Sequence, residues 1–260
     1  MAGGAARRGD RTGPLRRGAW RVTEPTPTAG SSEDFFRESE YWRSWSGVPD
    51  LTADIPYAIG ALRAAHRWVL DAPCGRGRIL RGLAARRPGL RLVGIDVNHR
   101  MVRQVKESVP DALALVASVY ALPFRDRAFD LVLCHQSFMH FDQPADALGE
   151  LTRVTRSDLY ISVTTRRQLN TLLRRLGFLR TDAVPHWTYN LEDLTRLLPT
   201  HEFVWRIVGA FLLGHKALRL PHAQHVYVHR VIGRWLPQWL LRRVGQTLFA
   251  YGRRRSAGPS

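Results

Sequence analysis

A turn that contains glycines and follows an acidic residue is the stretch best suited to chemistry. The apolar run 68–70 ends in Asp71, and Gly75 and Gly77 follow before a helix-like pattern begins. Glycines let a backbone approach a ligand closely, and a helix N-terminus offers unpaired N–H groups. A dinucleotide fingerprint is excluded because Leu80 stands where its third glycine belongs. Since a carboxylate here repels a pyrophosphate, the turn predicts a nucleotide-like ligand with a positive charge.

A second acidic residue follows at the spacing of a βαβ unit. The apolar pattern predicts a helix over 77–86 and a strand over 90–95 that ends in Asp96. A carboxylate at this point, about twenty residues after the glycines, can accept hydrogen bonds from both hydroxyls of a ribose. Capping of the helix expected over 98–107 is an alternative role for Asp96, and the two roles are compatible.

These features resemble the class I S-adenosylmethionine-dependent methyltransferase family, of the small-molecule type. The family's first motif usually has an acidic residue, a variable residue and then Gly-Cys-Gly-x-Gly; Pro73 replaces its first glycine. The sequences Leu-Pro-Phe at 122–124 and Phe-Asp at 129–130 also match. The resemblance spans roughly residues 40–252 and is strongest over 67–141. It implies S-adenosylmethionine as the cofactor and methyl transfer as the reaction.

The resemblance also implies which residues contact the cofactor. The turn would hold the methionine end and Asp96 the ribose, while the adenine would lie beside the segment where Ser118 replaces the family's usual acidic residue. The cofactor-binding residues expected in this way are Asp71, Cys74, Gly75, Gly77, Asp96, Val97, Ser118, Val119 and Gln136.

Two histidines follow the strand expected over 129–134. The carboxyl ends of parallel strands form the ligand-binding edge of an open α/β sheet, so His135 and His140 are expected near the reacting atoms. A histidine can deprotonate a hydroxyl or an amine near neutral pH. We therefore take His140 and His135 as candidate catalytic residues. The alternative for His140 is a structural role in capping the next helix.

The remaining periodicity predicts the elements that position these residues. Further strands are expected over 112–117, 159–163, 203–213 and 247–251, and further helices over 144–154, over 169–176 and after Asn190. Residues 156–158 are expected to form a short loop before their strand. The pattern predicts a Rossmann-like α/β fold whose seven-stranded sheet is mostly parallel, with an antiparallel last strand and helices on both faces.

The domain organisation follows from composition. Residues 1–30 contain mainly Gly, Arg, Pro and Thr and are expected to be a disordered basic tail. Residues 31–255 are expected to form one methyltransferase domain. It comprises N-terminal lid helices within 32–65, a cofactor-binding core over 67–164, and a C-terminal substrate part with an insert at 214–245.

The first lid helix is expected to begin after Ser32, and a second covers 55–65. Aromatic side chains on the first helix suit a lid over a sulfonium through cation–π attraction, with plain packing as the alternative. These side chains belong to Phe35, Phe36, Tyr41, Trp42 and Trp45.

The formal net charge is +17, and Lys106 and Lys216 are the only lysines. Such an excess of arginine reflects either a general bias of the organism's proteins toward arginine or an anionic partner. That partner would be a nucleic acid or a membrane surface. In the insert, arginines alternate with tryptophan and leucine, which suits an anionic membrane or a lipid-like substrate; core packing is the alternative. His222, His225 and His229 share a helical face without a nearby cysteine or acid, so we expect no metal.

The two cysteines do not form a disulfide framework, and no apolar window is long enough to span a membrane. We expect a cytoplasmic protein, with peripheral membrane attachment as an open alternative. The preferred acceptor is a small molecule or a lipid-like compound. One alternative is an RNA methyltransferase that uses its basic ends, although the Asn/Asp-Pro-Pro-Tyr loop of exocyclic-amine nucleic-acid enzymes is absent. The other is a non-catalytic cofactor-binding or scaffold protein.

Overall fold

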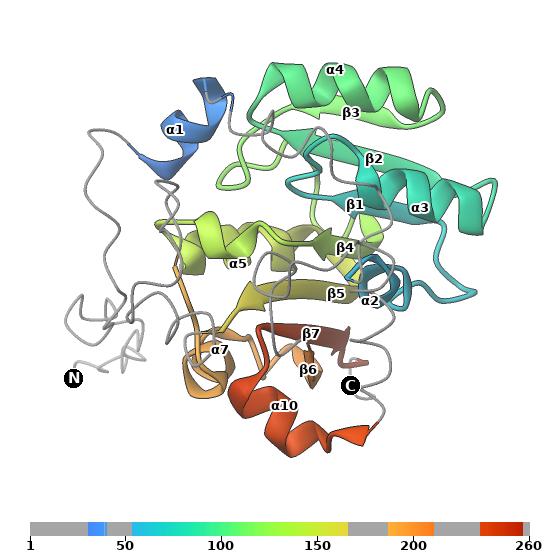
Figure 1. Ribbon diagram of the computed structural model, residues 1–260. Helices are drawn as coiled ribbons and strands as arrows, with labels where there is room; N and C mark the ends of the chain where they lie inside the picture. Colours follow the sequence, from blue (N-terminus) through green and yellow to red (C-terminus); the bar gives the residue numbers. More distant parts are fainter. Residues whose placement is uncertain (1–30, 39, 41–53, 166–186, 211–234, 257–260) are drawn as a thin grey trace, which may run out of the picture.

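The computed structural model describes residues 31–38, 40, 54–165, 187–210 and 235–256 (Figure 1). Several predictions fall outside these residues. They concern the basic tail over 1–30, the aromatic residues Tyr41, Trp42 and Trp45, the helix over 169–176, the three histidines at 222, 225 and 229, and the insert up to residue 234.

The described residues contain a seven-stranded sheet in the order β3-β2-β1-β4-β5-β7-β6. Its strands are β1 (Trp68–Asp71), β2 (Arg91–Asp96), β3 (Leu113–Val116), β4 (Phe129–Cys134), β5 (Thr155–Thr164), β6 (Phe203–Ala210) and β7 (Thr247–Arg254). Strands β1 to β5 pair in parallel, whereas β7 is antiparallel to both β5 and β6. The predicted fold, including the antiparallel last strand, is confirmed.

Helices cover both faces of this sheet (Figure 1). They are α1 (Ser32–Glu38), α2 (Ile55–Ile59), α3 (Arg78–Arg86), α4 (His99–Ser108), the 3₁₀ helix η2 (Phe138–His140), α5 (Pro144–Val154), α7 (Leu191–Leu197) and α10 (Gln238–Val244). Helices α2, α3 and α4 contribute to one hydrophobic cluster, and α5 and α7 contribute to the other. The helices bury apolar stripes because their apolar residues recur every three to four positions.

The helix ends follow local capping signals. Asn98 caps α4, because its side chain accepts a hydrogen bond from the backbone N–H of Arg100 at 2.9 Å. The helix expected after Asn190 is α7, and Asn190 caps it in a reciprocal pair with Asp193. Helix α2 ends at Ile59 rather than near residue 65, because the N–H groups of Ala61 and Leu62 donate only three residues back, to Ala58 and Ile59, in tighter 3₁₀-type turns.

The loop expected over 156–158 is wrong, because these residues already belong to β5. Thr155 pairs with Phe129 of β4, and Asp158 pairs with Leu131 of β4 and with Arg253 of β7. The polar residues did not indicate a strand, because their side chains form hydrogen bonds and ion pairs at the amino edge of the sheet.

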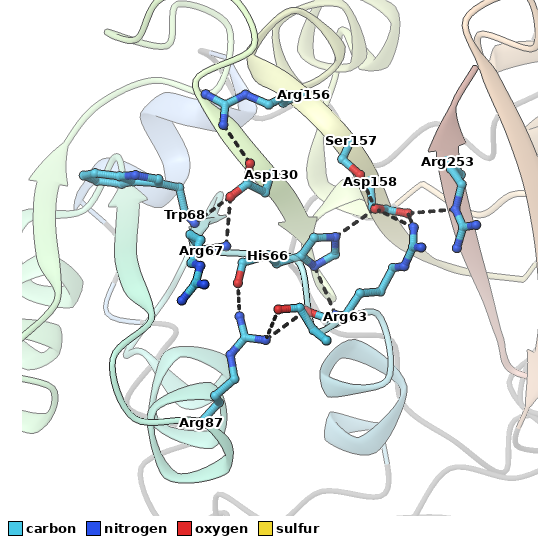
Figure 2. Close-up of polar contacts among 11 residues, drawn as sticks. Arg63, His66, Arg67, Trp68, Arg87, Asp130, Arg156, Ser157, Asp158 and Arg253 are labelled. Carbon is cyan, nitrogen blue, oxygen red and sulfur yellow. Dashed lines mark hydrogen bonds and ion pairs between the residues drawn. The ribbon is translucent and has the colours of Figure 1, made fainter. Parts of the chain in front are cut away.

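Figure 2 shows that network around Asp158. Its carboxylate lies 2.8 Å from Nε2 of His66 and 3.3 Å from the guanidinium of Arg63, and Arg253 lies 3.6 Å away. Burial by itself raises the pKa of Asp158, but the hydrogen bonds of His66 and Ser157 and the charge of Arg63 outweigh it and leave the pKa lowered. The network therefore fastens β5 to the segment that precedes β1.

A second carboxylate, Asp130 of β4, continues this edge (Figure 2). It accepts the backbone N–H groups of Arg67 and Trp68 at 2.8 and 2.9 Å and pairs with Arg156 at 2.8 Å. These contacts hold the start of β1 against β4 and β5. None of these contacts involves the opposite, carboxyl edge of the same strands.

Candidate functional site

The carboxyl edge of the sheet holds the glycine turn between β1 and α3. Strand order reverses where β1 lies between β2 and β4, which is where open α/β sheets bind ligands. Gly75 and Gly77 have φ angles of +50° and +79°, in the left-handed region that favours glycine. A Cβ on Gly77 would lie 3.1 Å from Cγ2 of Val105, whereas a Cβ on Gly75 would meet nothing within 4 Å. The turn thus packs on α4 at one glycine and has free space at the other.

Asp96 at the end of β2 is joined to this turn. One carboxylate oxygen accepts the N–H of Gly75 and the other accepts the N–H of Asn98, both at 2.9 Å. The side chain is buried, which raises its pKa to about 6 although both N–H groups act in the opposite direction. The cap of α4 is Asn98, so the capping role considered for Asp96 belongs to its neighbour.

Asp71 at the end of β1 is a second buried carboxylate. It is 1% exposed, and neither carboxylate oxygen has a hydrogen-bond partner among the described residues. Burial raises the pKa of Asp71 well above its ordinary value; the guanidinium of Arg78 acts against this rise, and the charge of Asp96 adds to it. A positive charge near the turn would therefore stabilise the ionised form of both carboxylates.

The carboxylate acceptors at this edge fit a ligand that carries vicinal hydroxyls and a cationic group. A carboxylate offers about four lone-pair sites, and Asp96 uses one on each oxygen, so each oxygen can accept one further hydrogen bond. The free space beside Gly75 lets the backbone approach such a ligand. The partnerless carboxylate of Asp71 supplies the negative charge that a cation needs.

Other residues expected at the cofactor lie along the same edge with different exposures. The thiol of Cys74 faces the sheet, where it would lie 2.9 Å from a Cβ on Gly94, so its contribution to a ligand is limited to its backbone. Val97 is half-buried beside Asp96. Ser118 is half-buried and its hydroxyl accepts the N–H of Tyr120 at 3.0 Å.

Val119 and Gln136 complete the predicted set. Val119 is buried in the hydrophobic cluster on the α5 face, which leaves little of its side chain for an adenine. Gln136 is half-buried directly after β4, with a φ of +53°, and its N–H donates to the hydroxyl of Ser162 at 2.6 Å. A non-glycine residue in this conformation stores strain, and such strain concentrates at functional sites.

His135 lies in a buried chain of polar groups. Its Nε2 is 3.0 Å from a carboxylate oxygen of Asp54, and its Nδ1 is 3.0 Å from the hydroxyl of Tyr160. With Asp54 ionised, Nε2 carries the proton and Nδ1 accepts from Tyr160, whose pKa is raised by burial. Both ring nitrogens are therefore in use and the side chain is 2% exposed, so His135 is placed to fix the end of β4.

His140 lies farther along the same loop, in η2, and is half-buried. Its ring centroid is 4.9 Å from that of Phe36 on α1. Phe36 also accepts, through its carbonyl, a hydrogen bond from the side chain of Asn98 at 3.0 Å. The first predicted lid helix therefore contacts the loops that follow β2 and β4, beside His140 and Asp96.

The start of α1 is anchored by residues that the sequence did not single out. Asp142 accepts the N–H of Ser32 at 3.2 Å and the hydroxyl of Tyr120 at 2.7 Å. Burial raises the pKa of Asp142, but these hydrogen bonds outweigh it, and the pKa is lowered. Asp54 and Tyr160, the partners of His135, were also missed. Each is far from its partner in sequence, so only the position of Asp54 before the Ile-Pro start of a helix offered a local signal.

Two general findings concern the described residues only. They hold no group of three or more His, Cys, Asp or Glu side chains arranged to bind a metal ion. Within them, too, every helix is too short or too polar to cross a bilayer.

Comparison with known proteins matches the segment that contains the candidate site to one family. The family model described as a methyltransferase domain matches residues 70–163. An uncharacterized methyltransferase of Schizosaccharomyces pombe is 27% identical over 144 residues, covering 51% of this chain and 49% of that protein. A demethylmenaquinone methyltransferase of Thermus thermophilus is 37% identical over 98 residues, covering 36% of this chain and 44% of that protein. The matches thus span about half the length of these curated relatives.

Among solved structures, the magnesium protoporphyrin IX methyltransferase of Synechocystis PCC 6803, with bound SAH, has a TM-score of 0.60 to this chain. The identity is 15%, and the alignment covers 86% of this chain and 98% of that one. At this identity the likeness establishes the fold.

Proposed function

We propose that this protein transfers a methyl group from S-adenosylmethionine to a small-molecule or lipid-like acceptor, because residues 70–163 match the methyltransferase domain model and the fold resembles that of a methyltransferase with bound SAH. The observation that carries the proposal is the hydrogen bond from the N–H of Gly75 to Asp96. It joins the glycine turn to the carboxylate that suits a ribose, and it leaves one acceptor site on each oxygen.

The residues divide the binding of the cofactor between them. Asp96 accepts the two ribose hydroxyls, and the turn at Gly75 and Gly77 approaches the methionine end with its backbone. Burial raises the pKa of Asp71 and of Asp96, and a bound sulfonium or ammonium would favour the ionised form of both carboxylates. The rest of the cofactor lies beside Val97, Ser118 and Gln136. The bound cofactor supplies a methyl group already activated on a sulfonium sulfur, so the protein contributes mainly proximity and orientation.

His140 is the proposed general base for an acceptor hydroxyl or amine. Its ring contacts the ring of Phe36 of α1, at the edge of the sheet that carries Asp96. His135 instead holds the start of this loop through Asp54 and Tyr160. This assignment gives the two predicted histidines different roles: proton acceptance for His140 and positioning for His135.

The nature of the acceptor is supported by the names of related proteins. One relative is named for demethylmenaquinone, and one structural neighbour is named for magnesium protoporphyrin IX. Both are organic molecules much smaller than a protein or an RNA.

The test is methyl transfer from S-adenosylmethionine with an isotopically labelled methyl group to a panel of quinones, porphyrins, lipids, glycans and RNA. We expect label in a small or lipid-like acceptor. For that acceptor, His140→Gln should lower kcat by roughly 10²–10⁴-fold, as for loss of a general base, while cofactor affinity stays the same.

His99→Gln, at an exposed histidine of α4, is the matched control and should leave kcat unchanged. Transfer only to RNA would contradict the proposed acceptor class. Cofactor binding without transfer to any member of the panel would support the scaffold alternative.

A further inference from the structure

Residues 235–241 expose two tryptophans. Trp235 is 83% exposed and Trp239 is 60% exposed, although tryptophan is on average well buried in folded proteins. Over 235–241 the sequence is Trp-Leu-Pro-Gln-Trp-Leu-Leu, with Gln238 as its only polar side chain. Large exposed apolar side chains that lie together mark an interaction surface.

This exposure is held in place by contacts on the opposite side of α10. Gln238 accepts the N–H of Gly209 at 3.1 Å, and Leu241 is 2% exposed. The backbone of Leu241 lies so near β6 that a Cβ on Gly209 would come within 2.2 Å of it. Trp239 and Arg243 are four residues apart and share the outward face of the helix, while Gln238 and Leu241 share the face toward the sheet.

Charge shows which kind of partner suits this surface. From residue 203 to residue 260 the chain has no aspartate or glutamate and ten lysine or arginine residues. In α10, Arg243 is exposed and Arg242 is half-buried, next to Trp239. Arginine beside exposed tryptophan is the composition of a segment that lies in the headgroup layer of an anionic bilayer. A nucleic acid would use the arginines as well, but the half-buried Leu236 and Leu240 beside the tryptophans suit the apolar part of a headgroup layer.

The C-terminal end of α10 lies at the same edge of the sheet as the candidate active site. Helix α10 leads into β7 through Gly245, whose carbonyl accepts the hydroxyl of Thr165, the residue after β5. The carboxyl ends of β1 and β2, with Asp71 and Asp96, lie at that edge of the parallel strands.

We propose that Trp235, Trp239, Arg242 and Arg243, called here the α10 face, dock this protein on an anionic lipid bilayer, with the two indoles in the headgroup layer. The inference concerns the surface of the molecule and does not depend on methyl transfer. Where methyl transfer does occur, docking would bring the carboxyl edge toward the membrane.

The experiment is flotation of the full-length protein with vesicles of phosphatidylcholine, made with or without phosphatidylglycerol. The protein should bind the vesicles that contain phosphatidylglycerol and release as salt is raised. Arg242→Gln with Arg243→Gln should lower the affinity by about fivefold for each arginine. Trp235→Ser with Trp239→Ser should lower it by at least about tenfold, because both indoles lose their place in the headgroup layer.

Trp68→Ser is the matched control, because Trp68 is 42% exposed beside Arg91 at the amino edge of the sheet. It should leave vesicle binding unchanged, and thermal unfolding should show that all variants fold. Three results would overturn the proposal: no binding to phosphatidylglycerol, binding that survives the loss of both tryptophans of the α10 face, or equal loss on Trp68→Ser. Retention on RNA that depends on the same four residues, without vesicle binding, would assign the face to a nucleic acid instead.

Discussion

Asp96 combines burial with hydrogen bonding to the backbone, and this combination makes ligand binding depend on pH. Its pKa is raised to about 6 mainly by burial. The hydroxyls of a ribose donate to the ionised form, so a free protein with protonated Asp96 must lose that proton before it binds fully. Affinity is therefore highest above the raised pKa and decreases as the pH falls through it.

We predict that the Kd for S-adenosylmethionine is constant above about pH 7 and rises, by up to about tenfold per pH unit, below about pH 6. Titration calorimetry over this range measures it. In Asp96→Asn the affinity should be weaker at neutral pH and should lose the part of this dependence that Asp96 causes. A Kd that is independent of pH in the unsubstituted protein would show that Asp96 is not the residue that accepts the hydroxyls.

At the scale of the element, the glycine turn depends on two backbone conformations that few residues adopt. Gly77 has a φ of +79° and packs against Val105 of α4. Gly77→Ala should lower the free energy of unfolding by about 1–2 kcal/mol, because an L-residue in the left-handed region is strained. It should also weaken cofactor binding, since the turn shifts to relieve the contact.

Gly149→Ala is the matched control, with the opposite sign. Gly149 is exposed within α5, and a Cβ there would meet nothing within 4 Å. This substitution should raise the free energy of unfolding by roughly 0.5–1 kcal/mol. Chemical denaturation of both variants measures the difference. Equal effects of the two substitutions would show that the turn does not require a left-handed residue at position 77.

Strand β5 depends on the ion pairs of Asp158 at the amino edge of the sheet. Because the pKa of Asp158 is lowered in the folded state, its contribution to stability is present above the ordinary value near 3.8 and is lost as the pH falls through the lower, folded value. Asp158→Asn should lower the free energy of unfolding at pH 7 by roughly 1–3 kcal/mol. The deficit should shrink at acidic pH.

Thermal unfolding at pH 7 and at acidic pH measures this deficit. Asp126→Asn is its control, since Asp126 also pairs with an arginine but its side chain is 76% exposed. Its effect should stay within about 0.5 kcal/mol. A deficit for Asp158→Asn that does not change with pH would mean that packing, rather than charge, accounts for it.

Element boundaries could be predicted from the sequence where the signals are local. Helices α3, α4 and α5 begin and end within one residue of the predicted ranges, because their apolar periodicity and caps lie in the helices themselves. The start of β5 could not be predicted. Asp158 is stabilised there by His66, which lies 92 residues earlier in the chain, and no local pattern reports such a partner.

For the whole molecule, the sheet was predictable because apolar runs and acidic strand ends recur in the order of a doubly wound fold. The acidic positions of the candidate site were predictable for the same reason. The surroundings of these acidic residues could not be predicted. His135, for example, is buried between Asp54, which is 81 residues away in the sequence, and Tyr160, which is 25 residues away. The sequence placed two histidines at one edge, but only the three-dimensional contacts distinguish their roles.

The measurement that tests the central claim most directly is titration calorimetry of S-adenosylmethionine and its demethylated product into the full-length protein, with Asp96→Ala and the exposed control Asp126→Ala. We predict that both ligands bind, that Asp96→Ala weakens binding by at least about tenfold through loss of two charge-assisted hydrogen bonds, and that Asp126→Ala leaves it unchanged. Folded protein that binds neither ligand, or that binds them equally well after Asp96→Ala, would contradict the assignment of this edge as a cofactor site.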